Sequence, residues 1–178
     1  MTRTDHSFSR RGLLQVGLCG SAALAGAGLL GSLSGCSAER PADGFVQLRT
    51  SDLPMLRRLT PILLERALPA PDMPGAVRDT LASLDLGLAH LPPAVSKQVR
   101  QLFDLLSLPL TRGPLTGIWR GWEQAQDADI HAFLRRWQNS SLALLRQGQL
   151  SLQQMVLMAW YGRPESWRHC GYPGPPAI

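Results

Sequence analysis

Cysteine and histidine are both scarce in this 178-residue chain, which has three cysteines and four histidines. Only Cys170 lies beyond residue 36, so the larger C-terminal part can form no internal disulfide. That part also lacks a Cys-x-x-Cys-His sequence for covalent haem, a nucleophile elbow and a phosphate-binding glycine loop. These absences argue against an enzyme that carries its own chemistry. Cys170 is expected either to pack as a small buried residue or to be covered by a partner.

The few histidines are not arranged as metal ligands. Asp127, Asp129 and His131 lie two residues apart, whereas ligands on one helix face need a spacing of three or four. His169 and Cys170 are neighbours whose side chains diverge, and no further ligand cluster accompanies them. We therefore expect no metal site, no cofactor-binding site and no catalytic residue in this chain.

Charged residues are also few, and most of the basic ones are arginines. Charged residues make up 17% of the chain, and the formal net charge is +5. Beyond residue 36, Lys97 is the one lysine among many arginines. The arginines are scattered, which is typical of a solvated surface rather than of a nucleic-acid-binding stripe. Nucleic acid is therefore not an expected partner.

What the sequence does contain is a distinctive N-terminal segment. Arg10 and Arg11 are followed by Leu13–Leu33, a stretch without a charge that includes five glycines. Adjacent arginines before a mildly hydrophobic stretch are typical of a twin-arginine export signal, which carries folded proteins across a membrane. A stable anchor would be richer in Leu, Ile, Phe and Val. Residues 1–35 are therefore interpreted as a signal segment that is not part of the folded domain.

The end of this segment, Leu33-Ser34-Gly35-Cys36, resembles the box at which bacterial lipoprotein precursors are cleaved and lipidated. Cys36 is accordingly the predicted lipidation site, while cleavage elsewhere and an uncleaved anchor stay open as alternatives. All three place the rest of the chain beyond the membrane, in the periplasm or cell envelope and attached to the membrane. Residues 36–47 are expected to form a linker and residues 48–178 a helical domain.

Helical periodicity dominates this second part and strand alternation is nearly absent, which predicts an all-α fold with a single small domain. Five or six helices are expected, among them about 51–67 with a kink at Pro61, 75–90, 94–106, 128–147 and 151–161. Gly148 is placed to end one helix, and Ser151 with Gln154 forms a capping box that begins the next. Residues 109–119 and the chain after Pro164 are expected to be irregular, ending in an extended Pro/Gly-rich tail.

Aromatic residues gather near the C-terminal end of the chain. Tryptophan and tyrosine bury large areas at low entropy cost, and a stiff Pro/Gly segment loses little freedom when it docks. We therefore predict a partner-binding segment made of Trp160, Tyr161, Trp167, Gly171, Tyr172, Pro173 and Gly174. Two alternatives stay open: the tryptophans could belong to the core, and the tail could be a terminal coil pinned by Tyr172.

Six segments together resemble a known family over most of residues 48–176. Four are short or leucine-rich: Leu48-Arg49-Thr50-Ser51-Asp52, Leu63 to Pro69 with Pro74-Gly75-Ala76, Leu84-Asp85-Leu86-Gly87-Leu88, and Leu102-Phe103-Asp104-Leu105-Leu106. Two are more specific: Trp160-Tyr161-Gly162-Arg163-Pro164-Glu165-Ser166-Trp167 and Gly171-Tyr172-Pro173-Gly174-Pro175-Pro176. The chain is similar in these segments to the small subunit of membrane-associated flavin dehydrogenases, the gluconate 2-dehydrogenase subunit 3 family.

The resemblance implies an accessory subunit with a twin-arginine signal and no cofactor of its own. The implied partner is a large subunit of the glucose-methanol-choline oxidoreductase type, which carries FAD and oxidises an alcohol or a sugar. The small subunit would take the folded flavoprotein across the membrane and stay bound as a stabilising subunit. Electrons would leave through a separate cytochrome c subunit. The alternative is a free-standing periplasmic lipoprotein with a structural or ligand-binding role.

Overall fold

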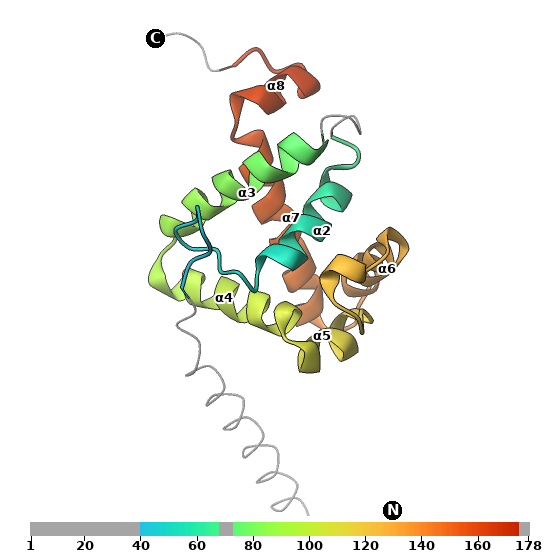
Figure 1. The fold of residues 1–178 in the computed structure, drawn as a ribbon. Coiled ribbons are helices and arrows are strands. Elements are labelled where there is room, and N and C mark those ends of the chain that lie inside the picture. Colours follow the sequence, from blue (N-terminus) through green and yellow to red (C-terminus); the bar gives the residue numbers. More distant parts are fainter. Residues whose placement is uncertain (1–39, 68–72, 175–178) are drawn as a thin grey trace, which may run out of the picture. The chain divides into compact units, whose positions relative to one another are not determined.

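The structure is a computed structural model that describes residues 40–67 and 73–174 (Figure 1). Within these residues the domain is all-α, with seven α-helices, one short 3-10 helix and no strand beyond an isolated bridge between Pro41 and Arg49. The all-α prediction is thus confirmed, with more helices than expected. The predicted signal residues Arg10 and Arg11 and the predicted lipidation site Cys36 lie outside the described residues.

The helices follow one another with short connections. Their bounds are α2 Leu53–Leu64, α3 Met73–Ala89, α4 Pro93–Ser107, α5 Pro109–Thr116, η2 Trp122–Gln124, α6 Asp127–Gln138, α7 Ala143–Tyr161 and α8 Pro164–Cys170. The positions of α2, α3 and α4 agree with the helices expected from leucine spacing. Helix α2 continues through Pro61. Proline at the first helical position begins α4, α5 and α8, where its missing N–H costs nothing.

Helix α2 lies at the centre of the domain and packs against α3, α6, α7 and η2 (Figure 1). A helix on the surface buries one stripe, whereas a helix that is covered on several sides buries most of its length. Seven of the twelve residues of α2 are buried, among them Leu53, Leu59 and Leu64. The core is therefore organised around α2.

An aromatic group in the core joins η2 to α6. The rings of Trp122 and Phe133 lie 6.2 Å apart and those of Phe133 and Trp137 4.9 Å apart, both in edge-to-face geometry. The indole N–H of Trp122 donates to the Leu106 carbonyl at 2.8 Å, and that of Trp137 donates to the Leu115 carbonyl at 2.9 Å. Both buried N–H groups are thus satisfied, as burial requires.

The predicted helix over residues 128–147 is wrong in its extent. α6 ends at Gln138, and α7 begins at Ala143 and runs through both Gly148 and the predicted capping box at Ser151. Gly148 serves packing instead of termination, because a Cβ at this position would lie 2.7 Å from Cζ3 of Trp137. The missing side chain lets α7 approach the aromatic group closely.

The prediction of an irregular segment over residues 109–119 is also wrong, because α5 forms there. The buried side chain of Arg112 joins the two ends of this helix. Its Nε donates to the Ile118 carbonyl at 3.2 Å, and Nη1 donates to the Ser107 carbonyl at 3.4 Å. Gly117, in the left-handed conformation with φ of 76°, then ends the helix.

The carboxylate of Asp85 in α3 fixes the segment that precedes α2. It accepts the backbone N–H of Val46 at 2.7 Å, of Gln47 at 2.8 Å and of Leu48 at 2.7 Å. Hydrogen bonds to an ionised carboxylate are stronger than neutral ones. Residues 40–47, which the sequence analysis placed in a linker, therefore pack on the helical domain, and Ala42 is buried there.

Arg49 forms a second buried ionic cluster close by. Its guanidinium donates to Asp52 through Nε at 3.0 Å and through Nη2 at 2.8 Å, and Nη2 also lies 2.7 Å from Oδ1 of Asp104 in α4. Burial alone would lower the pKa of Arg49, but hydrogen bonds and negative charge from Asp52 and Asp104 together raise it above its ordinary value. The arginine therefore stays charged and holds α4 to the start of α2.

Candidate interaction surface

The predicted partner-binding residues begin at the end of α7, where two neighbours have different environments. Trp160 is 3% exposed and packs in a small cluster with Leu64, Ala76 and Val156. Tyr161, the next residue, is 40% exposed. Trp160 is therefore a core residue that holds α7 to α2 and α3, and it is not part of the surface. For Trp160, the alternative that the tryptophans belong to the core is the one that the structure supports.

Helix α8 follows after a sharp turn, where the sequence predicted no regular structure. Arg163 anchors this turn to α3, because its Nη2 lies 3.3 Å from Oδ2 of Asp79. The hydroxyl of the buried Ser166 donates to the Arg163 carbonyl at 2.7 Å. Gly171 in the left-handed conformation, with φ of 71°, ends α8. These contacts fix the turn, and Pro164 begins a helix directly after it. The prediction that the chain is irregular after Pro164 is therefore wrong for residues 164–170.

The chain after α8 turns back onto Trp167. The backbone N–H of Tyr172 donates to the Trp167 carbonyl at 3.0 Å, and the two rings meet edge to face with centroids 5.4 Å apart. Gly174, with φ of 100°, lies so close that a Cβ there would be 3.2 Å from the Trp167 ring. Residues 171–174 are thus pinned by Tyr172 and Trp167 and do not extend away from α8, whereas Pro175 and Pro176 lie outside the described residues.

The structure brings the remaining predicted residues together at one end of the domain. The indole N–H of Trp167 donates to the Tyr161 carbonyl at 3.0 Å, so α8 is tied to the end of α7. Tyr172 is 48% exposed, and Met158, one helical turn before Tyr161, is exposed as well. We call Met158, Tyr161, Trp167 and Tyr172 the C-terminal surface. Pro173 and Gly171 are exposed beside it.

Charges border this surface at the start of α8. Arg163 Nε lies 3.3 Å from Oε2 of Glu165, in addition to its contact with Asp79. Hydrogen bonding of the Glu165 carboxylate to its own backbone N–H, in the first turn of the helix, lowers the pKa of Glu165, and Arg163 contributes in the same direction. An apolar centre with a charged border is the usual arrangement of a protein interface.

The histidines and Cys170 of the described part of the chain have separate surroundings. Among the described residues no group of three or more His, Cys, Asp or Glu side chains could hold a metal ion. His131 lies 3.2 Å from Glu65, and His90 Nδ1 lies 2.7 Å from the Leu86 carbonyl. Cys170 is exposed, so the expectation that it packs as a buried residue is wrong.

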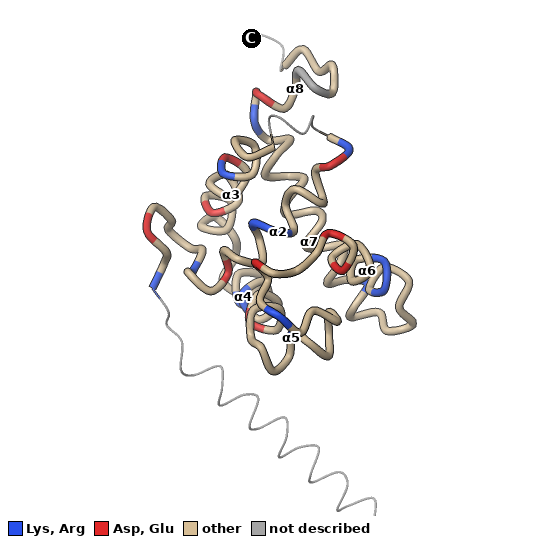
Figure 2. Tube along the Cα trace, turned by 45° about the vertical axis from the view of Figure 1, so that its right-hand side comes forward, with Lys and Arg blue, Asp and Glu red and all other residues tan. Residues whose placement is uncertain are grey.

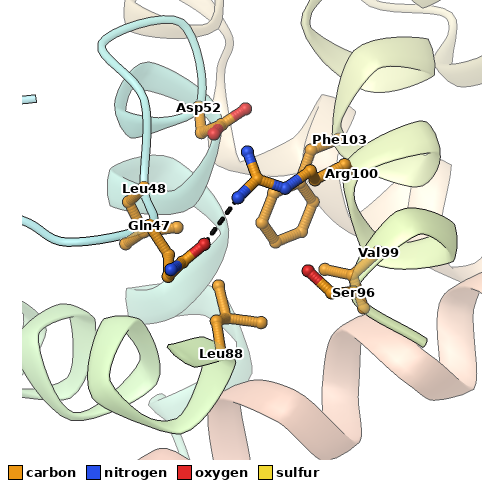
Figure 3. Close-up of a pocket in the computed structure, with 8 residues that line it drawn as sticks. All are labelled: Gln47, Leu48, Asp52, Leu88, Ser96, Val99, Arg100 and Phe103. Carbon is orange, nitrogen blue, oxygen red and sulfur yellow. Dashed lines mark hydrogen bonds between the residues drawn. The ribbon is translucent and has the colours of Figure 1, made fainter. Parts of the chain in front are cut away.

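Two hollows in the domain are poor ligand sites. One lies between the segment before α2, the end of α3 and α4, and Figure 3 shows Arg100 reaching across it to Gln47. Its free volume of about 10 Å³ is close to what a single water molecule needs. The other, of about 460 Å³, is open and lined by Phe45, Arg57, Pro61, Met73, Pro74, Val77, Arg78 and Leu81. We assign it no ligand.

The chain matches no protein-family model, and comparisons with curated proteins and with solved structures find no significant match. In the part of the chain that the structure describes, no helix has both the length and the apolar character needed to cross a bilayer. The C-terminal surface is the candidate interaction site of the described residues.

Proposed function

We propose that this protein is the non-catalytic small subunit of an exported FAD-dependent dehydrogenase complex, which oxidises an alcohol or a sugar. In this role it binds a folded flavoprotein of the glucose-methanol-choline oxidoreductase type through its C-terminal surface. The signal in residues 1–35 directs the pair across the membrane, and the small subunit then stabilises its partner in the periplasm. The flavin belongs to the partner, and a cytochrome c subunit removes the electrons.

The observation that carries this proposal is the contact between Trp167 and Tyr172 at the surface, where the Trp167 indole is also tied to the backbone of Tyr161. Tyr161, Trp167 and Tyr172 are tied together by a ring contact and by hydrogen bonds to the Tyr161 and Trp167 carbonyls. The side chains of Trp167 and Tyr172 are therefore ordered before any partner binds, which lowers the entropy cost of association. Aromatic anchors of this kind supply much of the binding energy in protein interfaces.

A second support comes from the segments in which the chain resembles the small-subunit family. Three of these segments contain the charged residues of the buried ionic clusters: Arg49 and Asp52, Asp85, and Asp104. Buried charges need specific partners, so they constrain the packing of a domain more than leucine patterns do. The segments that resemble the family therefore include charged residues that hold the helices of this domain together.

The alternative function is a free-standing periplasmic lipoprotein with a structural or ligand-binding role. It shares the export signal with the first proposal and differs in having no flavoprotein partner. No feature of the two hollows favours a particular ligand, so the alternative has no binding site to name. It is separated from the first proposal by whether a flavoprotein stays bound.

The proposal is tested by purifying the complete chain, with an affinity tag, from cells that also express the candidate flavoprotein. A complex with flavin absorbance and a defined ratio of the two chains is the expected result. Replacing Tyr161 and Tyr172 with alanine should weaken the complex, because both lie on the C-terminal surface. Leu86→Ala is the matched control, since Leu86 is an exposed apolar residue of α3 outside that surface.

Recovery of the chain alone, together with normal export of the flavoprotein in its absence, would defeat the proposal. Equal weakening by the control variant and by the tyrosine variants would remove the role given to the C-terminal surface. In that case the partnership could stand, but a different surface would have to carry it.

A further inference from the structure

A second exposed apolar region lies at the end of the domain opposite α8. Figure 1 shows α8 at one end and α5 at the other. Three of the most exposed large apolar side chains of the described residues belong to this end: Leu110 at 79%, Trp119 at 75% and Leu144 at 80%. Leu108 and Leu142 are exposed beside them in the sequence. We call these five residues the α5 surface.

Contacts between helices bring the parts of the α5 surface together. Trp119 lies on the backbone of α5, because a Cβ at Gly113 would be 2.5 Å from its ring, and Leu110 is one helical turn before Gly113. The end of α5 is joined to α6 at the Leu115 carbonyl, which accepts N–H groups from Arg136 at 2.7 Å and from Trp137 at 2.9 Å.

The same chain of contacts continues into α7. Trp137 packs against Gly148 of α7, and Leu144 shares the helix face of Gly148. Exposed apolar side chains from α5, from the connection after it and from the start of α7 thus occupy one end of the molecule.

The charges in the segments that carry the α5 surface are basic. Residues 105–122 and 135–150 contain five arginines and no Asp or Glu: Arg112, Arg120, Arg135, Arg136 and Arg146. Arg112 is buried, and the other four are exposed. The acidic residues that border these segments are Asp104, which is paired with Arg49, and Glu123. Figure 2 shows α6 with both signs of charge, because its first turn carries Asp127 and Asp129 and its last turn carries Arg135 and Arg136.

We propose that the α5 surface is a peripheral membrane-binding surface that takes an anionic phospholipid bilayer. Leucine and tryptophan side chains enter the boundary between headgroups and acyl chains, where tryptophan is favoured. Arg120, Arg136 and Arg146 meet the headgroup phosphates. A second copy of the chain fits this surface poorly, because pairing would place like charges against each other. The inference does not depend on the flavoprotein, whose predicted site is at the other end.

The test is hydrogen–deuterium exchange of the complete chain, read by mass spectrometry, on three samples. One contains vesicles of equimolar phosphatidylcholine and phosphatidylglycerol, one contains vesicles of phosphatidylcholine alone, and one contains no vesicles. Exchange should slow in peptides covering 105–122 and 139–150 on the anionic vesicles, and stay unchanged in peptides covering 158–174. Attachment through residues 1–36 alone would not slow exchange in peptides covering 105–122 and 139–150, so these peptides distinguish the two kinds of membrane contact.

Two variants locate the contact. Leu144→Glu, and separately Leu110→Glu with Trp119→Glu, should each remove most of the slowing, because a carboxylate opposes both the apolar and the electrostatic attraction. Met158→Glu is the matched control, an equally exposed apolar residue at the opposite end, and should leave the slowing unchanged. Circular dichroism confirms that each variant is folded, and Leu144→Glu serves if the α5 variant is not.

Three results overturn the proposal. The first is unchanged exchange in these peptides while the chain is bound to anionic vesicles. The second is equal slowing on neutral vesicles, which removes the role of the arginines. The third is slowing without vesicles that grows with protein concentration, which would identify a second copy as the occupant.

Discussion

Nη2 of Arg49 lies 2.7 Å from Oδ1 of Asp104 and 2.8 Å from Oδ1 of Asp52, so one buried guanidinium joins two carboxylates from separate segments. This contact holds α4 against the start of α2. Asp85 does the equivalent for the segment before α2 with three backbone N–H groups. The N-terminal side of the domain is thus fixed by ionic contacts, while its centre is fixed by leucine and aromatic packing.

Replacing Arg49 should therefore be costly. Arg49→Met leaves the carboxylates of Asp52 and Asp104 close together without a cation, and we expect a loss of about 3–5 kcal/mol in the free energy of unfolding. Urea unfolding followed by circular dichroism measures this loss. Arg57→Met is the control, because Arg57 is an exposed arginine of α2. Similar losses in the two variants would contradict the importance given to the cluster.

The cluster should also give stability that persists at alkaline pH. Because the pKa of Arg49 is raised in the folded protein, its contribution is fully present below the ordinary arginine pKa and is lost only as pH rises through the higher folded-state value. Arg49→Lys should bring that loss into reach, since the ordinary lysine pKa is about 10.4. The difference in unfolding free energy between wild type and this variant should grow with pH above neutrality, and a constant difference would contradict this account.

Asp85→Asn should loosen the segment before α2. The asparagine amide places an N–H group where the carboxylate accepted hydrogen bonds, and we expect a loss of about 2–3 kcal/mol. Amide hydrogen exchange should show the largest acceleration at Val46, Gln47 and Leu48. Uniform acceleration across the domain would mean that Asp85 supports the whole fold and not this segment.

Gly148→Ala tests whether this glycine serves packing or helix termination. In an open helical position alanine is favoured over glycine by about 1 kcal/mol, but here the new Cβ would lie 2.7 Å from the Trp137 ring. We expect destabilisation by about 1–3 kcal/mol, as in other overpacked cores. Gly87→Ala in α3 is the matched control, because nothing lies within 4 Å of its Cβ position, and it should be neutral or stabilising.

Removal of the residues after Cys170 should separate binding from folding. Tyr172 and Gly174 cover the Trp167 ring, so the truncated chain should show a shift of tryptophan fluorescence toward longer wavelength. Helicity by circular dichroism should stay nearly unchanged, since the contacts described for Tyr172 and Gly174 are with Trp167 of α8. Binding of the flavoprotein should weaken in the same sample. Loss of helicity would show instead that the tail is structural.

The sequence alone was sufficient for the fold class and for the positions of α2, α3 and α4, because leucines at helical spacing and prolines at helix starts are local signals. It also indicated the aromatic residues of the C-terminal surface. It was not sufficient for α5, α8 or the break between α6 and α7. Those depend on Arg112, on Arg163 and on the fit of Gly148 to Trp137, which are contacts between segments.

Tertiary structure alone decided which aromatic and charged side chains are covered. Trp160 is buried and Trp119 is exposed, a difference that depends on which helices pack against each of them. Asp85 occupies a stripe of α3 that also carries Leu81, Leu84 and Leu88, and that position was the available signal for its burial. Periodicity determines which residues share a helix face, but only the packing of the helices determines which face is covered.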